Sequence, residues 1–280
     1  MESAISFIDK GPLTVSIVAA DTSGSTAEWR AGAVPARDPV ARFPVAGKAR
    51  EGRWTGLVPV SQGWSPDGAQ VLRVRANQQD PQPLAPATDR LWLADPSFRA
   101  DRIVAVLRGM EKLSLDDLAG IQRDVHDQAA HGAAALLAKA VAATTDATPK
   151  LCDIAQTLAA WDGAVRAESV AAAVTLVAMS RHVLPELLPV ARFGRWAEYP
   201  ERAWPAGLRI LTASVSPWFA DPQARDVFLV KALQSAVKEL EAELGEAQAG
   251  WTLGRLGTPV AQHHPLVGLE LFSGAVSPSL

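Results

Sequence analysis

Amide side chains after a predicted strand and arginines at the start of the next predicted helix suit chemistry on a developing negative charge. They belong to residues 71–103, VLRVRANQQDPQPLAPATDRLWLADPSFRADRI. Apolar and basic residues partly alternate over 71–75, which predicts a strand, and a helix is predicted to begin at Arg99. An amide at the end of a strand and an arginine at the start of the next helix can converge on one point. Such N–H donors stabilise an oxyanion, an effect typically worth about 2.7–4 kcal/mol in the barrier.

Other patterns that carry chemistry are absent from the sequence. It contains no GxGxxG, no P-loop and no GxSxG, so nucleotide binding and the usual serine-hydrolase elbow lack support. The single cysteine, Cys152, excludes an intramolecular disulfide and a thiolate-rich metal site, and we expect it to be a small buried hydrophobe on a helix. We expect solvated or hydrogen-bonded histidines, because none has zinc-site spacing: His126, His131, His182, His263 and His264.

Composition indicates a folded globular protein. Of 280 residues, 48% are hydrophobic and 20% are charged. A net charge of −3 with scattered basic residues gives no drive towards nucleic acid or anionic membranes. The N-terminus lacks a basic leader followed by an apolar run, so we expect no secretory signal and a cytoplasmic location for the chain as written. The most apolar run, around residues 171–179, is shorter than the ~18 residues of a membrane span.

The first part of the chain is predicted to be rich in strands and loops. Residues 13–30 indicate a hairpin, because a β-branched run is followed by the turn residues DTSG (21–24). Residues 32–68 carry five prolines and are predicted to be a long irregular segment. The strand over 71–75 follows.

The rest of the chain is predicted to be mostly helical. Ser114 and Asp117 form a capping-box pattern before a helix that Gly132 is expected to interrupt, and residues 190–220 are expected to be irregular. Asp221 and Gly245 are predicted to cap the last strong helix. The other predicted helices are 99–110, 150–160 and 168–184, with a linker over 144–149.

These elements predict an α+β fold with a few antiparallel strands followed by a large helical region. We expect residues 1–98 to form a β-rich and loop portion, 99–250 the helical region and 251–280 the start of a further β segment. The nine tryptophans fall mostly in predicted loops, where they are expected to anchor the chain onto a core.

A series of short loop motifs occurs in a fixed order. It reads GAVPAR (32–37), WTGLVP (54–59), SPDG (65–68), ANQ (76–78), FRADRI (98–103), IQRD (121–124) and LAAWDG (158–163). This order resembles the middle of the β chain in the penicillin acylase family. These are N-terminal-nucleophile amidohydrolases, which also include acyl-homoserine-lactone and cephalosporin acylases. The resemblance implies part of an αββα fold and extends more loosely to GRL (254–256) and HPL (264–266).

The resemblance implies a reaction and two site residues. In that family a serine at the newly exposed N-terminus of the β chain attacks an amide carbonyl, with its own α-amino group as the base. A backbone N–H and an asparagine side chain form the oxyanion hole. Asn77 matches that asparagine, and Arg102 matches an arginine that supports the site. The alternative is that Asn77 closes a turn and Arg102 pairs with Asp101 or Asp95.

The sequence also departs from the family pattern. It contains no Ser-Asn-x-Trp start, and Met1 lies downstream of the expected nucleophile. The second amide of the usual Ala-Asn-Asn is replaced by Gln78. Only Pro39 and Asp89 match the calcium site of the family, so we expect no calcium or other cofactor to be held by this chain alone.

Three hypotheses follow. The first is a fragment of an amidohydrolase for linear amides, such as penicillins or acyl-homoserine lactones, that is inactive alone because the serine nucleophile is missing. The second is one subunit of a split acylase, whose partners are the missing α chain and the nucleophile-bearing β segment. The third is a helical scaffold or interaction module over residues 99–244. If part of the core is missing, we also expect apolar strand surface to be exposed and the chain to self-associate.

Overall fold

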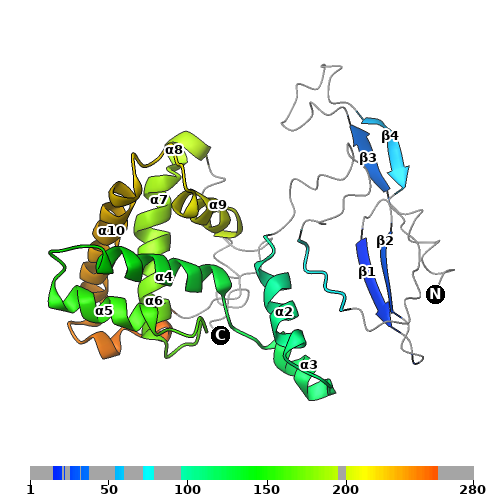
Figure 1. The fold of residues 1–280 in the computed structure, drawn as a ribbon, viewed down its shortest axis with the longest axis horizontal. Coiled ribbons are helices and arrows are strands. Elements are labelled where there is room, and N and C mark those ends of the chain that lie inside the picture. Colours follow the sequence, from blue (N-terminus) through cyan, green and yellow to red (C-terminus); the bar gives the residue numbers. More distant parts are fainter. Residues whose placement is uncertain are drawn as a thin grey trace, which may run out of the picture. The chain divides into compact units, whose positions relative to one another are not determined.

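The computed structural model describes residues 15–20, 22, 26–31, 33–37, 54–59, 72–78, 96–194 and 200–257 (Figure 1). The chain divides into two compact units, Met1–Ile121 and Gln122–Leu280. Strands and helices both occur among the described residues of the first unit, and helices dominate those of the second. The fold class is therefore α+β, as predicted. The predicted boundaries at residues 98 and 250 stay predictions.

Two antiparallel strand pairs are described in the first unit. β1 (Val15–Ala20) pairs with β2 (Thr26–Ala31), with Val15 opposite Ala31, which confirms the predicted hairpin. β3 (Ala33–Arg37) pairs with β4 (Trp54–Pro59), within a segment that was expected to be irregular. That expectation was wrong for these residues. Pro35 and Gly56 are unusual in strands, so the sequence pattern did not predict β3 and β4. Proline is tolerated in a strand at a sheet edge.

The predicted strand over 71–75 is not formed by its described residues, 72–75. Side chains rather than a backbone ladder connect this stretch to β2. The Nε of Arg73 donates to the hydroxyl of Thr26 at 3.5 Å, and Arg75 forms an ion pair with Glu28. The partial alternation in the sequence therefore reflects arginines that pair with β2.

Two helices end the first unit, and both follow the predicted pattern. α2 (Phe98–Arg108) and α3 (Leu115–Gln122) begin close to their predicted starts. The capping box is confirmed, because the Asp117 N–H donates to the Ser114 hydroxyl at 3.1 Å and the Ser114 N–H donates to the Asp117 carboxylate at 2.8 Å. Hydrogen bonds from the Ser114 side chain and backbone lower the pKa of Asp117.

α4 (Gln128–Ala142) begins the helical unit and runs through Gly132 without interruption, so the predicted break there was wrong. The break lies before it, at Asp127. The Asp127 carboxylate caps α4 by accepting the N–H groups of Ala129 and Ala130, at 2.8 and 3.0 Å. A helix tolerates an interior glycine at a cost of about 1 kcal/mol relative to alanine.

α5 (Pro149–Ala159) and α10 (Pro222–Leu244) confirm their predicted positions, and α10 also confirms its predicted caps. Thr148 caps α5 and Asp221 caps α10, each with a proline in the first helical positions. α5 packs against α4, and α10 packs against both α4 and the π-helix η1 (Ala178–Val183). The buried alanines of α4 permit this close packing: Ala130, Ala133, Ala134 and Ala140.

One helical run is longer than predicted. α6 (Val170–Val177), η1 and α7 (Leu184–Leu187) follow one another without a break (Figure 1). The 18 residues of Val170–Leu187 are apolar enough to cross a membrane by length and composition, and 61% of them are buried within the structure. The uninterrupted apolar stretch is shorter, as expected, because Ser180, Arg181 and His182 follow Met179. Because the run packs against α4, α5 and α10, its apolar character is that of a core helix.

The expectation of irregular structure over 190–220 was also wrong. α8 (Val190–Phe193) and α9 (Pro200–Thr212) occupy much of it. Pro205 and Gly207 have low helix propensity, so the sequence pattern did not predict α9. Its buried residues are Ala203, Leu208 and Leu211. A Cβ at Gly207 would lie 2.3 Å from a Leu184 methyl, so the glycine permits α9 to approach α7 closely.

Gly163 is expected to tolerate no side chain. It turns the chain after α5 with φ +80°, as predicted for this stretch, and a Cβ there would lie 2.5 Å from the His126 ring. Gly163→Ala should lower the free energy of unfolding by about 2–3 kcal/mol in urea titrations. The matched control is Gly132→Ala, because nothing lies within 4 Å of a Cβ at that helical position. It should stabilise the chain by up to about 1 kcal/mol. Equal stability of the two variants would contradict this account.

Candidate functional site

Asn77 lies in a left-handed turn. Its φ is +63°, and it is the one non-glycine residue with positive φ among the described residues. Asparagine adopts this region more readily than most residues, because its short polar side chain can bond locally. Asn77 is exposed, whereas the preceding Ala76 is buried. The turn therefore presents an amide side chain to the surroundings.

The backbone before Asn77 is held from both sides by side chains. The Ala76 N–H donates to Oε1 of Gln78 at 2.6 Å, and Nε2 of Gln78 donates to the Val74 carbonyl at 2.9 Å. From α2, the guanidinium of Arg99 donates to the Ala76 carbonyl at 2.9 Å. Both polar groups of Ala76 are thus bonded, which restrains the two successive peptide units before Asn77.

An arginine of the following helix, Arg99, contacts the turn through the Ala76 carbonyl. Sequence reasoning assigned the supporting role to Arg102, which is half-buried in the same helix. Residues three apart share a helical face, so FRADRI carried a signal for both arginines. The roles of Asn77 and Arg102 in an oxyanion site stay predictions.

Two calcium-site matches and two histidines lie outside the described part of the chain. These are Pro39, Asp89, His263 and His264. Within the described ranges, no group of three or more His, Cys, Asp or Glu side chains is placed to hold a metal ion.

The described histidines have packing or pairing partners. The His131 ring lies edge-on to His126 and to Trp161, with ring centroids 5.7 and 6.2 Å apart. Nε2 of His182 lies 2.7 Å from the Glu239 carboxylate. The His182 contact agrees with the expectation of hydrogen-bonded or solvated histidines, whereas the rings of His126 and His131 pack against aromatic neighbours.

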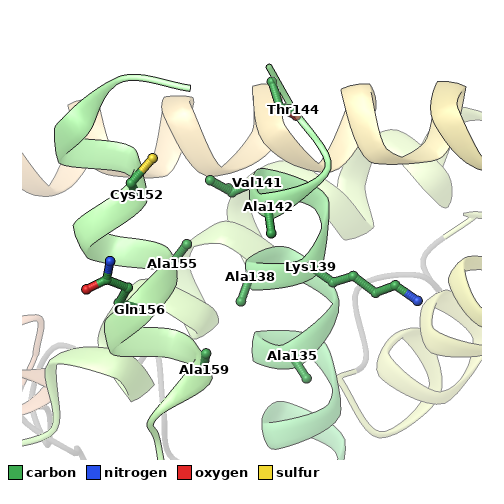
Figure 2. Close-up of a pocket in the computed structure, with 10 residues that line it drawn as sticks. All are labelled: Ala135, Ala138, Lys139, Val141, Ala142, Thr144, Cys152, Ala155, Gln156 and Ala159. Atoms are coloured by element: carbon green, nitrogen blue, oxygen red, sulfur yellow. The ribbon is translucent and has the colours of Figure 1, made fainter. Parts of the chain in front are cut away.

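A groove of about 580 Å³ lies between α4 and α5 (Figure 2). Alanines make up half of its lining residues, and Lys139 and Gln156 extend away from its centre. Cys152 is exposed at this groove, so the expectation of a buried cysteine was wrong. The thiol lies on the face of α5 that the core leaves uncovered. Without converging polar groups, the groove offers no catalytic arrangement.

A charged cluster ties η1 to α10 and makes stability depend on pH. The Glu239 carboxylate accepts a hydrogen bond from Arg181 and pairs with His182, and these contacts, chiefly that with Arg181, lower the pKa of Glu239. A lowered pKa in the folded state adds stability above the unfolded value of about 4.3, and this stability is lost as pH falls through the folded value.

Glu239→Gln should therefore lower the free energy of unfolding at pH 7, by up to about 1 kcal/mol for such a surface cluster. The difference from wild type should shrink below about pH 4. Urea titrations between pH 3 and pH 7 measure it. Glu186→Gln, at an exposed position of α7, is the control and should change little. A difference that is constant with pH would contradict the linkage.

The chain was compared with known proteins. The family model described as penicillin amidase matches residues 6–278. The structure is similar to the thermostable penicillin G acylase from Alcaligenes faecalis, with a TM-score of 0.67 and 18% sequence identity. The match covers 90% of this chain and 51% of that chain, so this chain spans about half the length of the acylase chain. At this identity the likeness shows the fold alone. No curated protein matches.

Proposed function

Because this chain belongs to the penicillin amidase family, we propose that it is part of an amidohydrolase that cleaves linear amides. In this proposal it contributes the side-chain donor of the oxyanion hole. The observation that carries the proposal is the turn at residues 76–78. An exposed asparagine stands there in a left-handed conformation, on a backbone that Gln78 and Arg99 hold in place.

The proposed reaction is acyl transfer to a serine and then to water. A serine at the N-terminus of another segment attacks the amide carbonyl, and its α-amino group takes the proton. The carbonyl oxygen becomes negatively charged, and the Asn77 amide donates a hydrogen bond to it. Collapse releases the amine, and hydrolysis of the acyl-serine releases the carboxylic acid. Arg102 supports the site from α2.

We further propose that the chain does not hydrolyse amides by itself. Its 280 residues contain no Ser-Asn-x-Trp sequence of the kind that begins the family's β chain. A nucleophile-bearing acylase segment, supplied as a separate polypeptide, would complete the site. Pocket-forming residues would come largely from that segment, so penicillins and acyl-homoserine lactones are both candidate substrates.

The test is reconstitution. The purified chain is assayed with a chromogenic acyl-anilide, alone and after mixing with a segment that carries the N-terminal serine. We expect hydrolysis only in the mixture. Hydrolysis by the chain alone would overturn the proposed dependence on a partner. Failure of every mixture would overturn the contribution to an amidohydrolase.

Exposed apolar residues of the first unit support a missing partner. Val15 and Val18 of β1 are 37% and 44% exposed, and Leu72 is 44% exposed. We therefore expect the chain to self-associate at micromolar concentration and to become monodisperse with the segment bound. Light scattering during gel filtration measures this. A monodisperse monomer with one cooperative melting transition would contradict the expectation.

The alternative is a non-catalytic scaffold or interaction module. The helical unit supports it, because its described residues have a buried core built from α4, α5, α6 and α10. This function would predict a cooperatively folded chain with no amidase activity in any reconstitution. A single active mixture would exclude it.

A further inference from the structure

We propose that Gln78 is the positioning residue for Asn77, an inference that rests on the proposed function. Gln78 replaces the second asparagine of the Ala-Asn-Asn pattern that the chain otherwise resembles. Its side chain bonds the backbone on the N-terminal side of Asn77, and it would act on the reaction only through Asn77.

Both ends of the Gln78 amide are engaged in the turn. Oε1 accepts from the Ala76 N–H at 2.6 Å, and Nε2 donates to the Val74 carbonyl at 2.9 Å. The side chain therefore reaches back two residues to a donor and four residues to an acceptor. A glutamine amide supplies one acceptor and two donors on two methylene groups, so it can bond to both. An asparagine is one methylene shorter and has less reach.

The conformation of Asn77 explains why the two hydrogen bonds of the Gln78 side chain, here called the clamp, are needed. A φ of +63° is disfavoured for every residue with a side chain, so neighbouring contacts must hold it. Gln78 binds the N–H of Ala76 and Arg99 binds its carbonyl, which belongs to the peptide bond that enters Asn77. These bonds hold two successive peptide units, so neither the unit that enters Ala76 nor the unit that enters Asn77 can flip freely. The amide of Asn77 then starts from a fixed backbone, which a preorganised oxyanion donor requires.

The first experiment measures the clamp without any activity. Hydrogen exchange of the Ala76 amide is followed by NMR in the full chain and in Gln78→Met, which keeps the length of the side chain and removes both bonds. We expect Ala76 to exchange roughly tenfold faster in the variant. Gln122→Met, at an exposed position that ends α3, is the matched control and should leave Ala76 unchanged. Equal exchange in wild type and Gln78→Met would overturn the clamp.

The second experiment tests whether the clamp acts through Asn77. In the reconstituted amidase, Gln78→Met should lower kcat roughly tenfold and leave KM within about twofold, because an oxyanion donor acts in the transition state. In an Asn77→Gly background the same change should cost nothing further, because the donor is already gone. An equal loss in both backgrounds would indicate a general structural role and overturn the positioning role.

The two experiments distinguish a failure of this inference from a failure of the proposed function. A wild-type mixture without activity would overturn the proposed function and, with it, any catalytic effect of Gln78. The exchange result would still decide whether Gln78 holds the turn.

Discussion

Trp251→Ala is expected to lower the free energy of unfolding by about 3–5 kcal/mol. Trp251 is fully buried, and it is the largest completely buried side chain among the described residues. Its Nε1 donates to the Gly245 carbonyl at 2.7 Å, at the C-terminal end of α10. Truncation therefore leaves a large cavity and removes the partner of a carbonyl at a helix end.

Trp251 also joins segments that are distant in sequence. Lys150 of α5 lies 5.2 Å from the centre of its ring and pairs with Glu241 of α10. The next turn of the chain contacts the loop before α6, because the Gly254 N–H donates to the Ala167 carbonyl at 2.7 Å. Loss of the ring should therefore loosen the contact between α5 and the end of α10.

Chemical denaturation of the full chain, followed by far-UV circular dichroism, measures the effect. Trp251→Phe should lose only about 1–2 kcal/mol, because it keeps most of the apolar volume and gives up the hydrogen bond. Trp218→Ala is the comparison at a tryptophan that is 40% exposed. A loss for Trp251→Ala no larger than that for Trp218→Ala would refute the anchoring role.

The second large effect is expected on catalysis. In a reconstituted amidase, Asn77→Gly should lower kcat by about 10²–10³-fold, because it removes one side-chain donor from the oxyanion hole. Glycine adopts positive φ freely, so the turn keeps its backbone. Any loss then reports the missing amide rather than a changed turn.

Asn77→Asp is the matched variant. Aspartate has nearly the same shape and also tolerates the left-handed region, but it places a carboxylate where the donor was. It should be at least as inactive as Asn77→Gly, and both variants should retain the wild-type free energy of unfolding within about 0.5 kcal/mol. Steady-state kinetics with an acyl-anilide measure the effect. If either variant keeps full activity, Asn77 is not the oxyanion donor.

Helices with strong end signals were predictable from sequence. Asp221 followed by Pro222 and Gly245 after Leu244 locate α10, and Ser114 with Asp117 locates the start of α3. Such caps depend on neighbouring residues, so a local pattern suffices. The match of motif order likewise led to the family that the comparisons show.

Features that depend on tertiary contacts were not predictable. α9 contains Pro205 and Gly207, two residues that usually end helices, and its packing against α7 outweighs their low propensity. The exposure of Cys152 depends on which face of α5 meets the core. At the candidate site, sequence identified Asn77 and an arginine from the next helix. The contact of Arg99 with Ala76 needed coordinates, because Arg99 and Arg102 share one helical face.

The π-helix η1 has a consequence for comparing this chain with its relatives. A π turn holds about one residue more than an α turn, so the residues after Val183 are displaced by one position along the helix relative to those before Ala178. One residue corresponds to about 100° of rotation. A relative with an unbroken α-helix here would align only with a one-residue gap between 178 and 183. An ungapped alignment would rotate the counterparts of the residues after Val183, beginning with Leu184, by about 100° around the helix axis.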